Sequence, residues 1–131
     1  MPITYSIDRA RQRLLAVATG AVSCAEILEH LEKERFDGGL PLPELGDATR
    51  ATVALSPAEV RDVVSRLREL GYQNALGPCA VVVGDDLSYG VLRMLEVLVE
   101  DVCDVRPFRS GNEAEKWLDS IAGPRPPSRH A

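Results

Sequence analysis

Residues 79–98 read CAVVVGDDLSYGVLRMLEVL, a pattern that predicts a strand followed directly by a helix. The apolar run from Cys79 to Val83 shows no polar alternation, which is typical of a strand buried on both faces of a parallel sheet. Asp85 or Asp86 can cap the helix that follows. The apolar positions of this helix are Leu87, Val91, Met94, Leu95 and Leu98. A strand–helix unit of this kind indicates an α/β domain.

The N-terminal part of the chain predicts a hairpin followed by a helix. Residues 3–7 alternate between apolar and polar side chains, and residues 13–19 form a second expected strand, closed by Gly20. Two strands this close together favour a hairpin. Ser23 and Glu26 then stand three residues apart, which is the spacing of a capping box at the start of a helix.

The middle of the chain contains the clearest helix signal. Ser56 is an N-cap candidate, Pro57 fits the first helical position, and Glu59 completes a capping box. We expect this helix to end at Gly71. Before it, residues 44–49 predict an imperfect strand, and the prolines beside that strand disfavour a central place in the sheet.

The C-terminal part predicts one more strand and helix. Residues 105–108 form the expected strand, and Asn112 is the expected cap of the last helix. The tail from Gly123 contains three prolines and is expected to be disordered. The whole pattern is β-β-α-β-α-β-α-β-α, which predicts an α/β domain over residues 1–122 with a mixed, mostly parallel sheet of about five strands and helices packed on it, followed by the tail 123–131.

The composition narrows the class of protein. A chain of 131 residues fits one domain that can bury a core without a stabilising metal or disulfide. The net charge of −5 and the scattered arginines argue against binding to nucleic acid. No apolar run approaches the ~18 residues of a membrane span, and the N-terminus has no signal-peptide pattern. We therefore expect a cytoplasmic protein without stable membrane insertion.

The cysteines and histidines do not form a recognisable site. Cys24, Cys79 and Cys103 are odd in number and widely separated, so we expect reduced thiols that pack as small apolar groups. Neither His30 nor His130 stands at a metal-ligand spacing from a cysteine. Cys24 stands at the start of the first expected helix and is the one candidate for a reactive thiol, because a helix N-terminus can lower a thiol pKa.

The sequence contains no complete motif for nucleotide binding, aspartyl-phosphate chemistry or general-base catalysis. The junction after Val83 offers one glycine and the acids Asp85 and Asp86, which would repel a phosphate. An aspartyl-phosphate receiver would also need a positioned lysine, whereas the two lysines fall inside expected helices. His30 lies in mid-helix and His130 in the tail, so neither is a good general base. We expect no enzyme activity, no cofactor and no metal; helix capping explains the two acids.

One edge of the expected sheet is the best place for a binding site, because ligands of open α/β sheets bind beyond the carboxyl ends of the parallel strands. Polar residues gather at that edge, and each also fits a plain role as a cap or turn residue. The candidate residues for a partner or ligand are Thr49, Arg50, Thr52, Ser56, Asp85, Asp86, Ser88 and Tyr89.

The chain resembles the bacterial STAS/SpoIIAA-like domains, which are related in fold to anti-sigma-factor antagonists and more remotely to Sec14-type lipid-binding domains. The resemblance runs from about Ile3 to Leu118. The features that carry it are the opening hairpin, DAT at 47–49 leading into LSPAEV at 55–60, DLSYG at 86–90 with Arg93, Met94 and Glu96, and VRPFR at 105–109 followed by EA at 113–114 and WL at 117–118. The family implies a single SpoIIAA-like domain.

The resemblance also implies a regulatory switch. In the antagonists, a serine within an Asp-Ser-Ser-Gly motif is phosphorylated at a helix start, which changes the charge of a docking surface. The matching residues here are 55–58, Leu-Ser-Pro-Ala, so the motif's Asp is Leu55 and Pro57 replaces its second Ser or Gly. Because the usual phosphorylatable motif is not intact, we expect Ser56 to serve as a plain N-cap, and it is the one candidate phosphosite if the switch is kept.

Two functional hypotheses remain open beside catalysis. The first is a non-catalytic regulatory or protein-interaction module that binds a protein partner as the antagonists do. The second is a carrier or sensor of a small apolar or lipid-like ligand, held in a cavity between sheet and helices lined by Met94 and Leu98. The edge strand of the hairpin can also pair with its copy in a homodimer.

Overall fold

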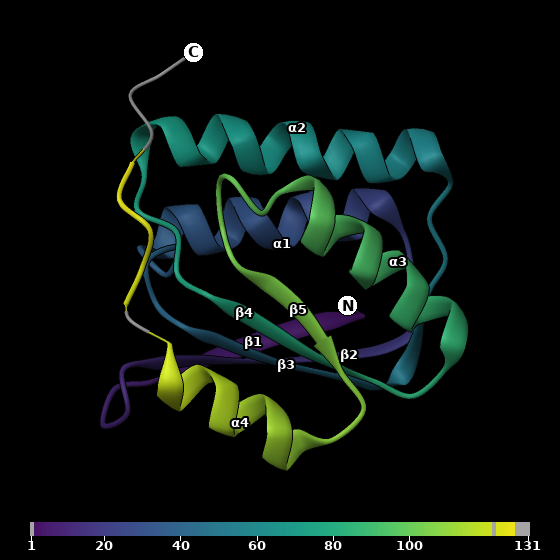
Figure 1. Cartoon of the computed structure of the whole chain (residues 1–131), viewed down its shortest axis with the longest axis horizontal. Coiled ribbons are helices and arrows are strands. Elements are labelled where there is room, and N and C mark those ends of the chain that lie inside the picture. The colour runs from purple at the N-terminus through teal and green to yellow at the C-terminus, as the bar shows by residue number, and fades with distance from the viewer. Residues whose placement is uncertain (1, 122, 128–131) are drawn as a thin grey trace.

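The computed structural model describes residues 2–121 and 123–127. Its elements follow the predicted order of strands and helices (Figure 1). They are β1 (Ile3–Asp8), β2 (Arg13–Val22), α1 (Cys24–Asp37), β3 (Glu44–Val53), α2 (Pro57–Gln73), β4 (Cys79–Val83), α3 (Asp86–Leu98), β5 (Val105–Phe108) and α4 (Gly111–Ser120).

The five strands form one mixed sheet in the order β1-β2-β3-β4-β5. β1 pairs with β2 as an antiparallel hairpin, and every other pair is parallel. The predicted α/β class and mostly parallel sheet are therefore confirmed. The expectation for residues 44–49 was wrong in one respect: β3 runs for ten residues through the centre of the sheet. Its prolines, Pro41 and Pro43, precede the strand, so they do not interrupt its hydrogen-bond ladder.

The helices cover both faces of the sheet unequally. α4 lies alone on one face, while α1, α2 and α3 lie on the other (Figure 1). The alternation of side chains along β4 matches this layering. Ala80 and Val82 pack with Phe108 and Leu118 on the α4 side. The neighbouring Val83 belongs to the larger core under the other three helices.

Local capping signals place three of the four helix starts correctly. Ser23 with Glu26 and Ser56 with Glu59 both form complete capping boxes. Asp85 caps α3, because its carboxylate accepts a hydrogen bond from the Ser88 N–H at 2.7 Å. α4 differs from the prediction: Ser110, not Asn112, is its N-cap and accepts from the Glu113 N–H.

Two glycines do not end the elements they were expected to end. β2 continues through Gly20, which adopts a left-handed φ of 71° beside a register shift in the pairing with β3. α2 continues past Gly71 to Gln73, and Gly71 lies so close to Val102 that a Cβ there would be 2.7 Å from Cγ1 of Val102. A glycine inside an element can therefore serve a close contact instead of a turn.

In the tail from residue 123, which we expected to be disordered, Arg125 is held against the domain. Its backbone N–H donates to the Leu76 carbonyl at 2.8 Å and its carbonyl accepts from the Leu76 N–H at 3.0 Å. Its guanidinium also pairs with Asp104 at 3.0 Å. Residues 128–131 lie outside the described residues. Among the helices of the described part, none is both long and apolar enough to span a bilayer.

Candidate ligand cavity and its polar end

A cavity of about 170 Å³ lies between the sheet and the helices of its larger layer. Its floor consists largely of small residues on the inner face of β2 and β3, which leave space that larger side chains would fill. These floor residues are Ala16, Ala18, Gly46 and Ala48. Helix residues including Leu31, Leu67, Leu92 and Leu95 line the opposite side. The volume is comparable to an engineered apolar cavity of about 150 Å³ that stays dry and binds benzene.

The predicted lining of this cavity was wrong. Met94 and Leu98 are 44% and 43% exposed, and neither lines it. Leu92 and Leu95, on the buried side of α3, line it instead. α3 carries apolar residues around most of its circumference, so periodicity alone cannot say which of them face inward.

The polar end of the cavity is formed by three residues that sequence reasoning did not bring together. His30 and Glu34 stand one turn apart on α1, and Glu44 is the first residue of β3. We call this group the His30–Glu34–Glu44 cluster; all three residues line the cavity. One ring nitrogen of His30 and one carboxylate oxygen of each glutamate all lie within 4.8 Å of one another. The i,i+4 spacing of His30 and Glu34 was visible in the sequence, but the approach of Glu44 depends on the tertiary fold.

His30 contacts the two glutamates of the cluster in different ways. The Nε2 atom of His30 lies 3.0 Å from Oε2 of Glu44 and shares a hydrogen bond with it. The same nitrogen lies 2.8 Å from Oε1 of Glu34. That buried oxygen forms an ion pair with His30 but accepts no well-aligned hydrogen bond from the described residues. The rings of His30 and of Tyr5 from β1 also form a T-shaped pair, with the ring centroids 5.4 Å apart.

The environment moves the three pKa values in different directions. Burial and the neighbouring charge of Glu44 raise the pKa of Glu34 to about 9. Burial disfavours the charged form of His30, but its close contacts with the carboxylates of Glu34 and Glu44 outweigh it and raise its pKa to about 10. Burial also opposes the charge on Glu44, yet its hydrogen bonds with Glu34 and His30 lower its pKa.

The candidate residues at the carboxyl edge of the sheet have mostly structural contacts. The Asp47 carboxylate accepts from the N–H and hydroxyl of Thr49, and Arg50 and Thr52 are exposed. Ser56 serves as an N-cap, as described above.

Ser88, in the same predicted set, is fully buried. Its hydroxyl donates to Asp85 at 3.1 Å and accepts from the Val53 N–H at 2.8 Å. This links the start of α3 to the end of β3 and leaves the Ser88 hydroxyl no free surface.

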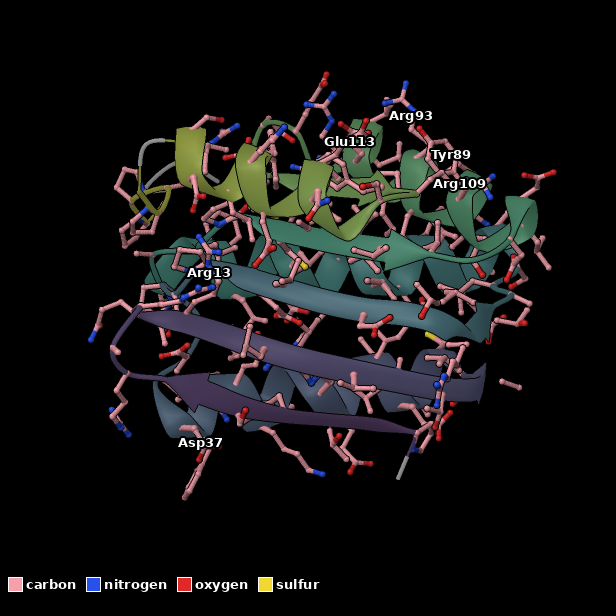
Figure 2. The ribbon with its side chains drawn as sticks, turned by 90° about the horizontal axis from the view of Figure 1, so that it is seen from below. Arg13, Asp37, Tyr89, Arg93, Arg109 and Glu113 are labelled. Atoms are coloured by element: carbon pink, nitrogen blue, oxygen red, sulfur yellow. The ribbon has the colours of Figure 1, made fainter. Side chains whose placement is uncertain are left out.

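Two residues of the predicted edge, Asp86 and Tyr89, contact the same arginine, Arg109. Figure 2 shows Tyr89 and Arg109 close together at one corner of the molecule. Arg109, which the candidate set omitted, forms an ion pair with Asp86. Its guanidinium also lies over the Tyr89 ring, 4.9 Å from the centroid. This corner lies beyond the end of β4, whereas Glu44 begins β3, so the cavity's polar end and the predicted edge are at opposite ends of the parallel strands.

The cysteines are free, in agreement with the expectation of unpaired thiols. Burial raises the pKa of Cys24 even though it begins α1, and its thiol donates to the Glu59 carbonyl at 3.7 Å. Burial also raises the pKa of Cys103 to about 12 and that of Cys79 well above its ordinary value. At Cys24, desolvation and the nearby charges of Glu59 and Asp62 all raise the thiol pKa, which disfavours a reactive thiolate there.

Comparison with known proteins supports the fold. No protein-family model and no curated protein sequence matches the chain. Among solved structures, the chain is similar to an uncharacterised DUF3478-family protein from Shewanella loihica, whose structure is described as having a SpoIIAA-like fold. The match has a TM-score of 0.55 at 20% identity and covers 88% of this chain and 93% of that one. The expected SpoIIAA-like fold is thereby confirmed.

Proposed function

We propose that this SpoIIAA-like domain is a non-catalytic carrier or sensor of a small apolar molecule that bears one polar group. The observation that carries the proposal is the cavity between the sheet and α1, α2 and α3. An apolar pocket with a few converging polar groups is the usual form of a small-molecule site. The cavity combines an apolar lining with the His30–Glu34–Glu44 cluster at one end.

The volume limits the size of the ligand. Pockets for drug-sized molecules usually measure ~300–1,000 Å³, so about 170 Å³ favours a smaller occupant, near the size of a single aromatic ring with a short substituent. Each buried Å² of apolar ligand surface contributes about 25 cal/mol, which favours apolar molecules over sugars or nucleotides. Oε1 of Glu34, which pairs with His30 but accepts no hydrogen bond, can accept one from a donor on the ligand.

A binding role without catalysis is supported by the state of the reactive groups. The three thiols have raised pKa values, which keeps them protonated and poor as nucleophiles. His30 is engaged by two carboxylates, so its imidazole is not a free base. Free thiols also suit a reducing compartment, and we place the domain in the cytoplasm.

Native mass spectrometry of freshly purified protein tests the proposal. We expect a small retained adduct that organic denaturation releases. Ala18→Leu places a larger side chain in the cavity and should abolish the adduct. Val17→Leu, at an exposed neighbouring position outside the cavity lining, is the matched control and should retain it. An adduct of equal abundance in both variants would refute the cavity as the binding site.

A regulatory module that docks a protein partner is the second candidate. The observation that favours it is the apolar surface of α3, where Leu87, Met94, Val97 and Leu98 are all exposed. The buried side of the same helix lines the cavity through Leu92 and Leu95. A partner with an apolar surface could therefore sense whether the cavity is filled. Met94→Ser with Val97→Ser should abolish binding of such a partner and leave the adduct unchanged.

A further inference from the structure

The polar end of the cavity contains one histidine and two glutamates, residue types that can bind a metal ion as well as form hydrogen bonds. We propose that His30, Glu34 and Glu44 bind one divalent transition-metal ion, such as Zn²⁺, at the polar end of the cavity. Imidazole and carboxylate groups are ligands that Zn²⁺ commonly uses, and catalytic or ligand-binding zinc sites hold three protein ligands with one open position. The cluster supplies three such ligands from two elements.

The three ligand groups lie close enough to surround one ion, although they are packed more tightly than a bound ion requires. Zn²⁺ binds nitrogen and oxygen at ~2.0–2.2 Å, so tetrahedral ligand atoms lie roughly 3.3–3.6 Å apart. The Nε2 atom of His30 is 2.8 Å from Oε1 of Glu34 and 3.0 Å from Oε2 of Glu44. Side-chain movements of less than 1 Å, roughly, would open both separations to the tetrahedral range. His30 and Glu34 also share one face of α1, because residues four apart are neighbours on a helix.

The buried oxygen of Glu34 is incompletely satisfied. The Glu34 side chain is 6% exposed, and its Oε1 atom forms an ion pair with His30 but accepts no hydrogen bond in the part of the chain that the structure describes. A buried polar atom without a partner is costly, and each such atom in a native protein needs an explanation. A metal ion bound between Glu34 and His30 would satisfy this oxygen.

Charge balance favours a divalent ion over a monovalent one. Once the ion has displaced the protons that His30 and Glu34 hold at neutral pH, the two carboxylates neutralise its two positive charges. The complex is then neutral in an apolar cavity where an unbalanced charge would be expensive. The donors are nitrogen and oxygen without sulfur, a set that suits zinc, manganese or ferrous iron better than cuprous copper.

The open coordination position would face the cavity, because all three ligands line it. Water or the polar group of the proposed apolar ligand could occupy that position. The inference shares its cavity with the proposed function, but the metal can bind while the apolar part is empty. Failure of metal binding and failure of ligand retention are therefore separate results.

The experiment is calorimetric titration of chelator-treated, full-length protein with Zn²⁺ at neutral pH. We expect one ion per chain. Glu34→Gln and Glu44→Gln should each weaken binding roughly 100-fold or more, because even the loss of an outer-shell partner commonly weakens metal sites by ~10–100-fold. Co²⁺ should give visible absorption bands in the wild-type protein, and these bands should be lost in His30→Ala.

Two controls exclude other sites. Glu29→Gln removes an exposed carboxylate from the same helix, and His130→Ala removes the other histidine of the chain. Both should bind Zn²⁺ like the wild type. Added Zn²⁺ should raise the melting temperature of the wild type and controls, but not of folded Glu34→Gln. Absence of a stoichiometric ion, or binding that survives both Glu→Gln changes, would overturn the proposal.

Discussion

The imidazole Nε2 of His30 lies 2.8 Å from Oε1 of Glu34, one turn later on α1, yet that oxygen accepts no well-aligned hydrogen bond from the described residues. The Nε2 atom shares its hydrogen bond with Glu44 instead. This leaves a buried acceptor pointing to the polar end of an otherwise apolar cavity. The proposed ligand would use this acceptor in the metal-free protein, and the proposed metal ion would use it when bound.

Ser56 should contribute stability as the N-cap of α2. Ser56→Ala removes the oxygen that accepts from the Glu59 N–H, so we expect a loss of about 1 kcal/mol in the free energy of unfolding. Ser56→Asp keeps a capping oxygen and should lose much less. Ser65→Ala, at an exposed position inside the same helix, is the control. Equal urea midpoints for Ser56→Ala and Ser65→Ala would contradict the capping role.

Two helical glycines should respond oppositely to alanine. A Cβ at Gly90 would meet no atom within 4 Å, so Gly90→Ala should stabilise the protein by ~0.5–1 kcal/mol through helix propensity. A Cβ at Gly71 would lie 2.7 Å from Cγ1 of Val102, so Gly71→Ala should destabilise it by ~1–3 kcal/mol through overpacking. Thermal melts of the two variants check the signs, and stabilisation by both would show that α2 does not pack as described.

The thiols should react slowly in the folded protein. Burial raises the pKa of Cys24, Cys79 and Cys103, and the thiolate is the reactive form. We expect a chromogenic disulfide reagent to label all three quickly in denaturant and slowly without it. A native thiol that reacts as fast as free cysteine would contradict their burial.

Acid should weaken the link between α3 and β3. The backbone N–H and hydroxyl of Ser88 donate to Asp85 and hold its pKa below the ordinary value. Since the folded pKa is lower than the unfolded value near ~3.9, this stabilisation is present above that value and is lost as the pH falls through the folded pKa.

Asp85→Asn should therefore flatten the acid side of the stability–pH curve. Asp62→Asn, on the exposed face of α2, is the comparison variant and should keep the wild-type slope. Identical acid slopes in Asp85→Asn and the wild type would rule out this contribution.

Much of the fold follows from signals that are local in sequence. The Ser23–Glu26 and Ser56–Glu59 capping boxes each lie within one helical turn, so helix starts can be predicted from neighbouring residues. The unbroken apolar run of β4 likewise indicates a buried parallel strand. The central place of β3 was harder to foresee, because it depends on pairing with β2 and β4 and not on the prolines before it.

The candidate site depends on contacts that no local pattern contains. Glu44 is 14 residues from His30, and their contact requires β3 to lie beneath α1. The carboxyl edge of the sheet was a reasonable general expectation for an α/β fold, but Ser88 proved to be a buried structural link there. The inward residues of α3 could not be distinguished from Met94 and Leu98 by periodicity.

The most direct test of the cavity's role is an NMR titration of ¹⁵N-labelled protein with benzene, an apolar probe that fits a cavity of this size. We predict saturable shifts of amide signals in β2, β3 and the buried side of α3, unchanged in Val17→Leu and abolished in Ala18→Leu. If saturating benzene leaves these signals unchanged in the wild type, or shifts them equally in Ala18→Leu, the cavity is not a ligand site.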